Sequence, residues 1–187
     1  MPNWCTNYVE IRTDDPELYQ AMLTRIEAAQ EAKEDHQGFF HSFIPCPAEL
    51  LDNDLTTWGG SEEEQTAREV KKAANKDKYG HTDWYDWRCE KWGTKWDVRD
   101  IEYYDGGDCI ELRFETAWSP PIPIYEEMER LGYHVKAKYG DEMTNFVGDW
   151  SNGVDKCYSL DQVPDRLKDF IARWVGEDQE EDNETTV

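Results

Sequence analysis

Apolar and polar residues alternate along several short stretches of the chain, which is the period of a half-buried β-strand. In the first stretch, Cys5, Val9 and Ile11 share one face, while Tyr8 and Glu10 lie on the other. The strands predicted in this way lie at about 4–12, 96–104, 109–118, 134–139 and 144–149. We expect each of them to bury one face more deeply than the other.

Other stretches repeat their apolar residues every three or four positions, the period of a helix with one buried face. The helices predicted in this way span about 16–34, 61–76, 84–92, 120–131 and 161–175. Ser61 and Glu64 stand at the start of the second helix with the spacing of a capping box. We expect Asp161 to cap the last helix. The second helix has only a thin apolar stripe and should lie on the surface.

Two further signals indicate how the strands are connected. Asp105-Gly106-Gly107-Asp108 predicts a tight hairpin turn between two strands, because glycine tolerates the positive φ that such turns need. The apolar run Phe39–Pro47 is expected to be a short edge strand that its prolines end.

In order, these elements come close to the pattern βαββαβ. The fold class predicted is therefore α+β, a ferredoxin-like sandwich in which helices pack on one face of an antiparallel sheet. This domain is expected to span residues 1–160, with a polar helical insertion at about 49–92. An extra C-terminal helix should follow at 161–175, and a disordered acidic tail at 176–187.

The 187-residue chain is strongly acidic, with 42 Asp and Glu against 20 Lys and Arg and a formal charge of −22. Six of these acids lie in residues 176–187, so the remaining chain, at −16, is acidic as well. Nucleic-acid binding depends on Lys and Arg at the phosphates, so no direct nucleic-acid partner is expected. A charge of this size either only keeps the protein in solution or suits a partner with a basic surface.

The five cysteines are widely spaced and form no CxxC pair, which is typical of reduced thiols in a cytoplasmic protein. The start of the chain leads directly into a strand, so we expect no secretory leader, and no apolar run has transmembrane length. The four histidines lack metal-ligand spacing. We therefore expect no metal, no cofactor, no membrane partner and no catalytic residue, while the oligomeric state stays open.

Five short motifs follow one another along the chain. They are Met1-Pro2-Asn3-Trp4-Cys5, Phe43-Ile44-Pro45-x-Pro47, Trp92-Gly93-Thr94-Lys95-Trp96-Asp97, Phe114-x-Thr116-Ala117-Trp118-Ser119-Pro120-Pro121 and Gly148-x-Trp150. Over residues 1–158, the chain thereby resembles the phage- and plasmid-borne family of small proteins with a ferredoxin-like domain. The resemblance implies that fold and a mobile-element origin. It implies no reaction and no catalytic residue.

Two groups of residues are candidate binding sites: Glu62, Glu63 and Glu64 in the insertion, and Lys95, Trp96, Asp97 and Trp118 in the tryptophan motifs. The glutamates form either a solvated face or a surface that docks a partner. A lysine beside aromatic rings either holds a ligand anion or stacks on a ring as a cation–π pair. The tryptophans are otherwise a structural corner, with Lys95 paired to an acid.

Three functions compete. The first is a non-enzymatic protein that binds and inhibits a basic host protein, by counter-defence, host takeover or DNA mimicry, in the host cytoplasm. The second is a protein that sequesters a nucleotide signal in an aromatic pocket, with Lys95 or Arg99 near the phosphate. The third, an enzyme, has the least support, because no catalytic motif occurs in the sequence.

Overall fold

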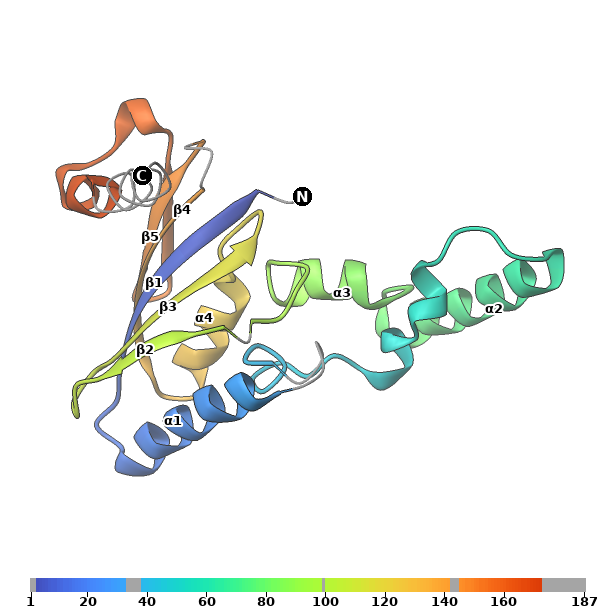
Figure 1. Ribbon diagram of the computed structural model, residues 1–187, viewed down its shortest axis with the longest axis horizontal. Coiled ribbons are helices and arrows are strands. Elements are labelled where there is room, and N and C mark those ends of the chain that lie inside the picture. Colours follow the sequence, from blue (N-terminus) through green and yellow to red (C-terminus); the bar gives the residue numbers. More distant parts are fainter. Residues whose placement is uncertain (1–2, 33–37, 99, 142–144, 173–187) are drawn as a thin grey trace, which may run out of the picture.

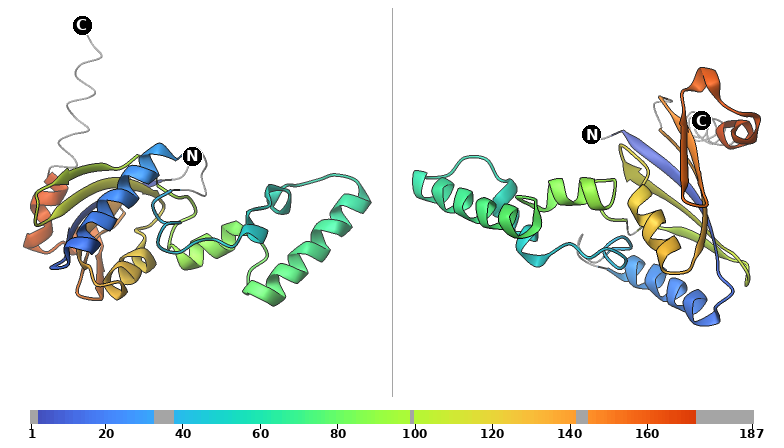
Figure 2. Two further views of the ribbon diagram at one scale, coloured as in Figure 1. Left: turned by 90° about the horizontal axis from the view of Figure 1, so that it is seen from below. Right: turned by 180° about the vertical axis from the view of Figure 1, so that it is seen from behind.

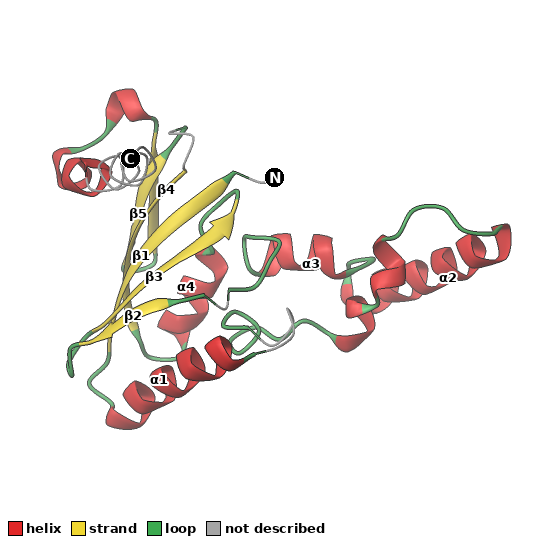
Figure 3. Ribbon diagram, in the orientation of Figure 1, coloured by secondary structure: helices red, strands yellow, loops and turns green. Residues whose placement is uncertain are grey.

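The structure, a computed structural model, describes residues 3–32, 38–98, 100–141 and 145–172 of the chain. The fold of these residues is α+β, with a six-stranded antiparallel sheet and the four α-helices α1 to α4 (Figure 3). The strands are β1 Trp4–Arg12, β2 Glu102–Asp105, β3 Ile110–Ala117, β4 His134–Asp141, β5 Val147–Ser151 and β6 Val154–Tyr158. The α-helices are α1 Pro16–Glu31, α2 Glu62–Tyr79, α3 Trp84–Lys91 and α4 Ile122–Arg130, and residues 165–172 are also helical.

The sheet has the strand order β2-β3-β1-β4-β5-β6, so the first strand of the chain lies in its interior. β1 pairs with β3 from Trp4↔Ala117 to Ile11↔Ile110, and with β4 from Cys5↔Asp141 onward. The residues of β1 that the alternation assigns to the buried face, Cys5, Val9 and Ile11, are at most 2% exposed. α1 and α4 lie on this face of the sheet (Figure 1).

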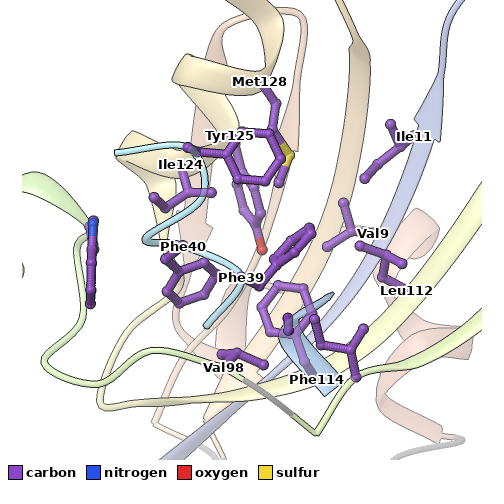
Figure 4. Close-up of a cluster of buried hydrophobic side chains, with 14 of the residues drawn as sticks. Val9, Ile11, Phe39, Phe40, Val98, Leu112, Phe114, Ile124, Tyr125 and Met128 are labelled. Carbon is purple, nitrogen blue, oxygen red and sulfur yellow. The ribbon is translucent and has the colours of Figure 1, made fainter. Parts of the chain in front are cut away.

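The main core fills the space between the sheet and these two helices. Met22 and Ile26 of α1 and Tyr125 of α4 are at most 1% exposed within it. Phe39 and Phe40, from the segment after α1, project into the same space and pack against strand and α4 side chains (Figure 4). The Phe40 and Phe114 rings meet edge to face, with their centroids 5.8 Å apart, so this segment is an integral part of the core.

Those two phenylalanines contradict the edge strand predicted at Phe39–Pro47. Residues 38–44 instead form successive tight turns, with the Phe43 and Ile44 amides donating to the Phe40 carbonyl. Phe39 and Phe40 are both fully buried on one side, whereas consecutive residues of a strand would point to opposite faces. The prediction was wrong because an apolar run does not by itself distinguish a strand from a turn that fills the core.

Other boundaries also differ from those predicted. The strand expected at 96–104 is confined to Glu102–Asp105, because the backbone at Val98 bonds to Phe39 instead of to the sheet. β6 was not predicted at all. Asp161 does not cap a helix but lies in a short 3₁₀ turn, Leu160–Gln162, where it accepts a hydrogen bond from Ser159. Parts of the stretches predicted at 16–34, 96–104, 144–149 and 161–175, and the whole tail 176–187, lie outside the described residues.

The opposite face of the sheet is covered in part by the helical segment 165–172. Leu167 and Phe170 pack there on Val147 of β5, and the Phe170 ring meets the Tyr8 ring edge to face at 5.3 Å. The sheet therefore separates a large core from a small one, and the C-terminal segment provides the cover of the small one.

Residues 52–83, here called the appendage, project away from the sheet and make the molecule elongated (Figures 1 and 2). α2, the main element of the appendage, has 18 residues, of which only Asn75 is buried. Ser61 and Glu64 form the predicted capping box at its start. The helix is held to the preceding segment by polar contacts, such as Lys71 Nζ to Asp52 at 2.8 Å and Lys78 Nζ to Glu49 at 2.8 Å.

The hairpin between β2 and β3 gives a first testable expectation. The Gly106 amide donates to the Cys109 carbonyl at 2.9 Å, and Gly107 has a φ of +82°, a backbone conformation that disfavours side chains. Gly107→Val should lower the free energy of unfolding by about 2 kcal/mol, measured by urea denaturation. Gly106→Val should cost less, since the φ of Gly106 is not in that region. Equal losses for the two variants would contradict this assignment of the turn.

Candidate functional site

Two of the tryptophan motifs meet around Lys95. The Lys95 Nζ lies 3.9 Å from the centroid of the Trp96 ring and 4.8 Å from that of the Trp118 ring. The ring of Trp4 packs against that of Trp96 at 5.8 Å, and the ring of Tyr85 meets that of Trp118 edge to face at 6.3 Å. We call these five residues the aromatic junction. Lys95 is thus a cation–π partner of two rings, one of the alternatives that the sequence left open.

Trp118 has an unusual backbone for a residue of its size. Its φ is +73°, and its side chain is 40% exposed at the end of β3. Its amide donates to the Asn3 carbonyl at 2.9 Å. Neighbouring bonds fix the same place: Thr94 Oγ1 donates to the Ala117 carbonyl at 3.0 Å, and Ser119 Oγ to the Gly93 carbonyl at 2.6 Å. A positive φ is unfavourable for a bulky residue, and it persists here because the surrounding hydrogen bonds hold the backbone in place.

Asp97 is adjacent to the aromatic junction in sequence, but its carboxylate binds backbone amides and not the aromatic rings. Its carboxylate accepts hydrogen bonds from the amides of Phe40 at 2.7 Å, His41 at 2.9 Å and Val98 at 2.8 Å. Burial raises the pKa of this carboxyl to about 6, although the three amides and Arg88 act to lower it. Asp97 therefore holds the turns after α1 against the body of the protein.

The predicted glutamates lie apart from these residues. Glu62, Glu63 and Glu64 form the first turn of α2, at the outer tip of the appendage (Figure 1). The Ser61 amide donates to Glu64 at 2.7 Å and lowers the pKa of the Glu64 carboxyl. Glu64 is thus engaged in the cap, which leaves Glu62 and Glu63 as the exposed carboxylates of the tip. The structure does not bring the two predicted groups into one site.

Other tryptophans belong to the interior. Trp92 is fully buried, and its Nε1 donates to the Ile44 carbonyl at 2.8 Å. Trp150 is 2% exposed and packs against the Tyr125 ring at 6.3 Å. These two positions belong to the core, whereas Trp118 is at the surface.

A hollow in the appendage was not predicted from the sequence. It has a volume of about 590 Å³ and lies between residues 55–59, α2 and the start of α3. Its lining includes Trp58, Arg68, Lys72, Trp84 and Tyr85. Arg68 and Lys72 stand one turn apart on α2, a spacing visible in the sequence, but nothing there shows that the segment 55–59 folds back beside them.

The described part of the chain holds no group of three or more His, Cys, Asp or Glu side chains that could bind a metal ion. His81 instead contacts Glu90, with its Nε2 at 2.9 Å from the carboxylate. Desolvation raises the pKa of the buried Cys5 thiol to about 12, which disfavours the reactive thiolate. Among the described helices, none is both long and apolar enough to cross a membrane.

Comparisons with known proteins show a likeness of fold. No protein-family model matches the chain, and no curated protein matches it either. Among solved structures, the fold is similar to the crystal structure of the protein api92 from Yersinia pseudotuberculosis, described by the family-model DUF1281. The TM-score is 0.44 and the sequence identity 11%, and the alignment covers 88% of this chain and 100% of the Yersinia chain.

Proposed function

We propose that the protein is a non-enzymatic binding protein of a phage or plasmid that docks on a basic surface of a host protein through its appendage and thereby inhibits it. The observation that carries the proposal is α2, an 18-residue helix with one buried residue. A helix exposed on nearly all sides adds little to the core. Its place at the far end of the molecule makes it available to a partner.

Electrostatics support the kind of partner. The chain has a formal charge of −22, and Glu62 and Glu63 project from the tip at the N-terminal end of α2. An acidic protein of this kind attracts a basic surface over a distance set by the salt concentration, about 8–10 Å under physiological conditions. DNA mimicry is the version in which that surface normally binds phosphates. The site of action would then be the host cytoplasm.

The finer fold assignment belongs to the same proposal. We infer that β1, α1, β2, β3, α4 and β4 form a ferredoxin-like unit to which β5 and β6 are added at one edge. The strand order β2-β3-β1-β4 and the position of α1 and α4 on one face support this inference. The appendage would then be an insertion between α1 and β2 of that unit.

Partner capture at the tip tests the function. A photo-crosslinking amino acid at position 63 should join the protein to one host protein in cell extract, and the same label at position 126 on α4 should not. With that partner purified, the double swap Glu62→Gln and Glu63→Gln should weaken binding about fivefold, because two exposed charges contribute on the order of 1 kcal/mol together. Glu126→Gln is the matched control on the body, and neither change should alter the melting temperature.

Salt provides the second measurement. The association rate should fall steeply between low and physiological salt, because screening removes the long-range attraction. The proposal fails if position 63 captures no partner at low salt. It also fails if the partner binds the double variant and the native protein equally well at every salt concentration.

A further inference from the structure

The hollow in the appendage has the size of a ligand site. Its volume of about 590 Å³ falls within the roughly 300–1,000 Å³ typical of pockets for small molecules. Leu55, which lines it, is fully buried, so this part of the appendage is anchored. Trp58, on its border, is fully exposed. A large apolar ring that is exposed to solvent beside this hollow is available to pack over a ligand.

Two cations of α2 line this hollow, which we now call the pocket. The guanidinium of Arg68 is fixed by the facing segment, since its Nη1 donates to Thr57 Oγ1 at 3.0 Å and its Nη2 to the Gly59 carbonyl. Lys72, one turn later, is half-buried. No carboxylate within the described ranges forms an ion pair with Lys72. Arg68 thus shapes the pocket, and Lys72 has its charge available for a ligand.

The pocket has an aromatic wall formed by Trp84 and Tyr85. The Trp84 and Tyr85 rings meet edge to face at 5.9 Å, and the Arg88 guanidinium lies 4.9 Å from the Trp84 ring centroid. The Nε1 of Trp84 is buried and has no hydrogen-bond partner among the residues that the structure describes. Because this N–H is out of contact with solvent, a ligand in the pocket would meet the ring of Trp84 and not its N–H.

Acidic residues line the pocket as well, but one is engaged elsewhere. Asp83 caps α3, where it accepts from the Tyr85 amide at 3.0 Å and from Thr82 Oγ1 at 3.0 Å. Glu69 is exposed. Inside the pocket a ligand would therefore meet Lys72, the aromatic rings and one exposed carboxylate, that of Glu69.

From this arrangement we propose that the pocket binds a small planar aromatic ligand with an anionic group, of the nucleoside monophosphate class. The rings of Trp58, Trp84 and Tyr85 would contact the planar part, and Lys72 would hold the phosphate. This pocket is separate from the acidic tip formed by Glu62 and Glu63, so its occupancy is a property beyond partner docking. Aromatic rings can stack on any of the bases, whereas Lys72 favours a ligand that carries a negatively charged phosphate.

Nuclear magnetic resonance of the 22.0 kDa protein tests the pocket directly. The indole N–H signal of Trp84, assigned by its loss in Trp84→Phe, should shift in a saturable way when AMP, GMP, CMP or UMP is added. Adenosine and guanosine, which lack the phosphate, should bind at least about tenfold more weakly, since a charge-assisted contact is lost. Inorganic phosphate alone should not reproduce the shift, because it lacks a ring.

Variants give the control. Lys72→Gln should weaken nucleotide binding about tenfold, whereas Lys76→Gln, one turn farther along α2 and exposed, should leave it unchanged. The proposal is overturned if no monophosphate moves the Trp84 signal up to millimolar concentration. It is also overturned if Lys72→Gln and Lys76→Gln have the same effect, or if nucleosides bind as well as their phosphates. Partner crosslinking at position 63 is a separate readout, so the two proposals can fail independently.

Discussion

Gly148→Ala should destabilise the protein more than a typical change of one methyl group, by about 3 kcal/mol. Gly148 lies opposite Tyr139 on neighbouring strands, and a Cβ added there would stand 2.3 Å from Cζ and Oη of the tyrosine. The ring has little freedom to move, because its Oη donates to Asp155 at 2.5 Å and the side chain is 1% exposed. Urea denaturation of the two proteins measures the difference.

A double-mutant cycle identifies the cause. In a Tyr139→Leu background the ring is absent, so adding Gly148→Ala should cost under about 1 kcal/mol. The Tyr139→Leu protein is less stable than the native one, but the cycle compares only the cost of the second change. If Gly148→Ala costs the same in both backgrounds, the tyrosine ring is not what excludes a side chain from position 148.

Asp97→Ala should lower the free energy of unfolding by about 3 kcal/mol, because it leaves the amides of Phe40, His41 and Val98 without their acceptor. The turns that these amides belong to carry the fully buried Phe39 and Phe40, so the loss should extend to the core. Asp100→Ala, at a nearby exposed position, should change stability by less than about 0.5 kcal/mol. Equal effects of the two changes would show that Asp97 is no anchor.

Asp97 should also leave a signature in the pH dependence of stability. Its folded pKa of about 6 lies above the value near 3.9 expected for an unfolded chain. The folded state therefore holds the proton more tightly, and this contribution is greatest below about pH 4 and is lost as the pH rises through 6. Asp97→Asn has no such titration. Between pH 4 and 7, the native protein should thus lose on the order of 2 kcal/mol relative to Asp97→Asn.

Denaturation of both proteins at several pH values measures this difference, since the titration of all other groups is common to the pair. A difference that stays constant would mean that the hydrogen bonds to Asp97 balance its burial, and one that moves in favour of the native protein as the pH rises would mean that they outweigh it.

Much of the candidate site was visible in the sequence as residue types but not as an arrangement. Lys95, Trp96 and Trp118 were singled out because charged and aromatic residues stand together in two motifs, and the structure does bring these three into contact. Asp97 was placed with them because it is adjacent in sequence, yet its carboxylate bonds to a segment more than fifty residues earlier. The pocket of Lys72 and Trp84 has no sequence motif, since its walls come from three separate segments.

The sequence by itself determined the elements whose information is local. These elements depend on residues that are close together in the sequence. They are the alternation in β1 and β3, the periodic faces of α1 and α4, the capping box of α2 and the glycine turn between β2 and β3. Only the tertiary structure decided what depends on distant partners. Phe39 and Phe40 lie in turns and not in a strand, because the core has space for both adjacent rings. The amides of Phe40 and His41, which no strand pairs, donate to the carboxylate of Asp97 instead. The roles of Asp97, Lys95 and Lys72 depend on which distant segments lie next to them in the folded protein. Side-chain packing and backbone hydrogen bonds bring those segments together.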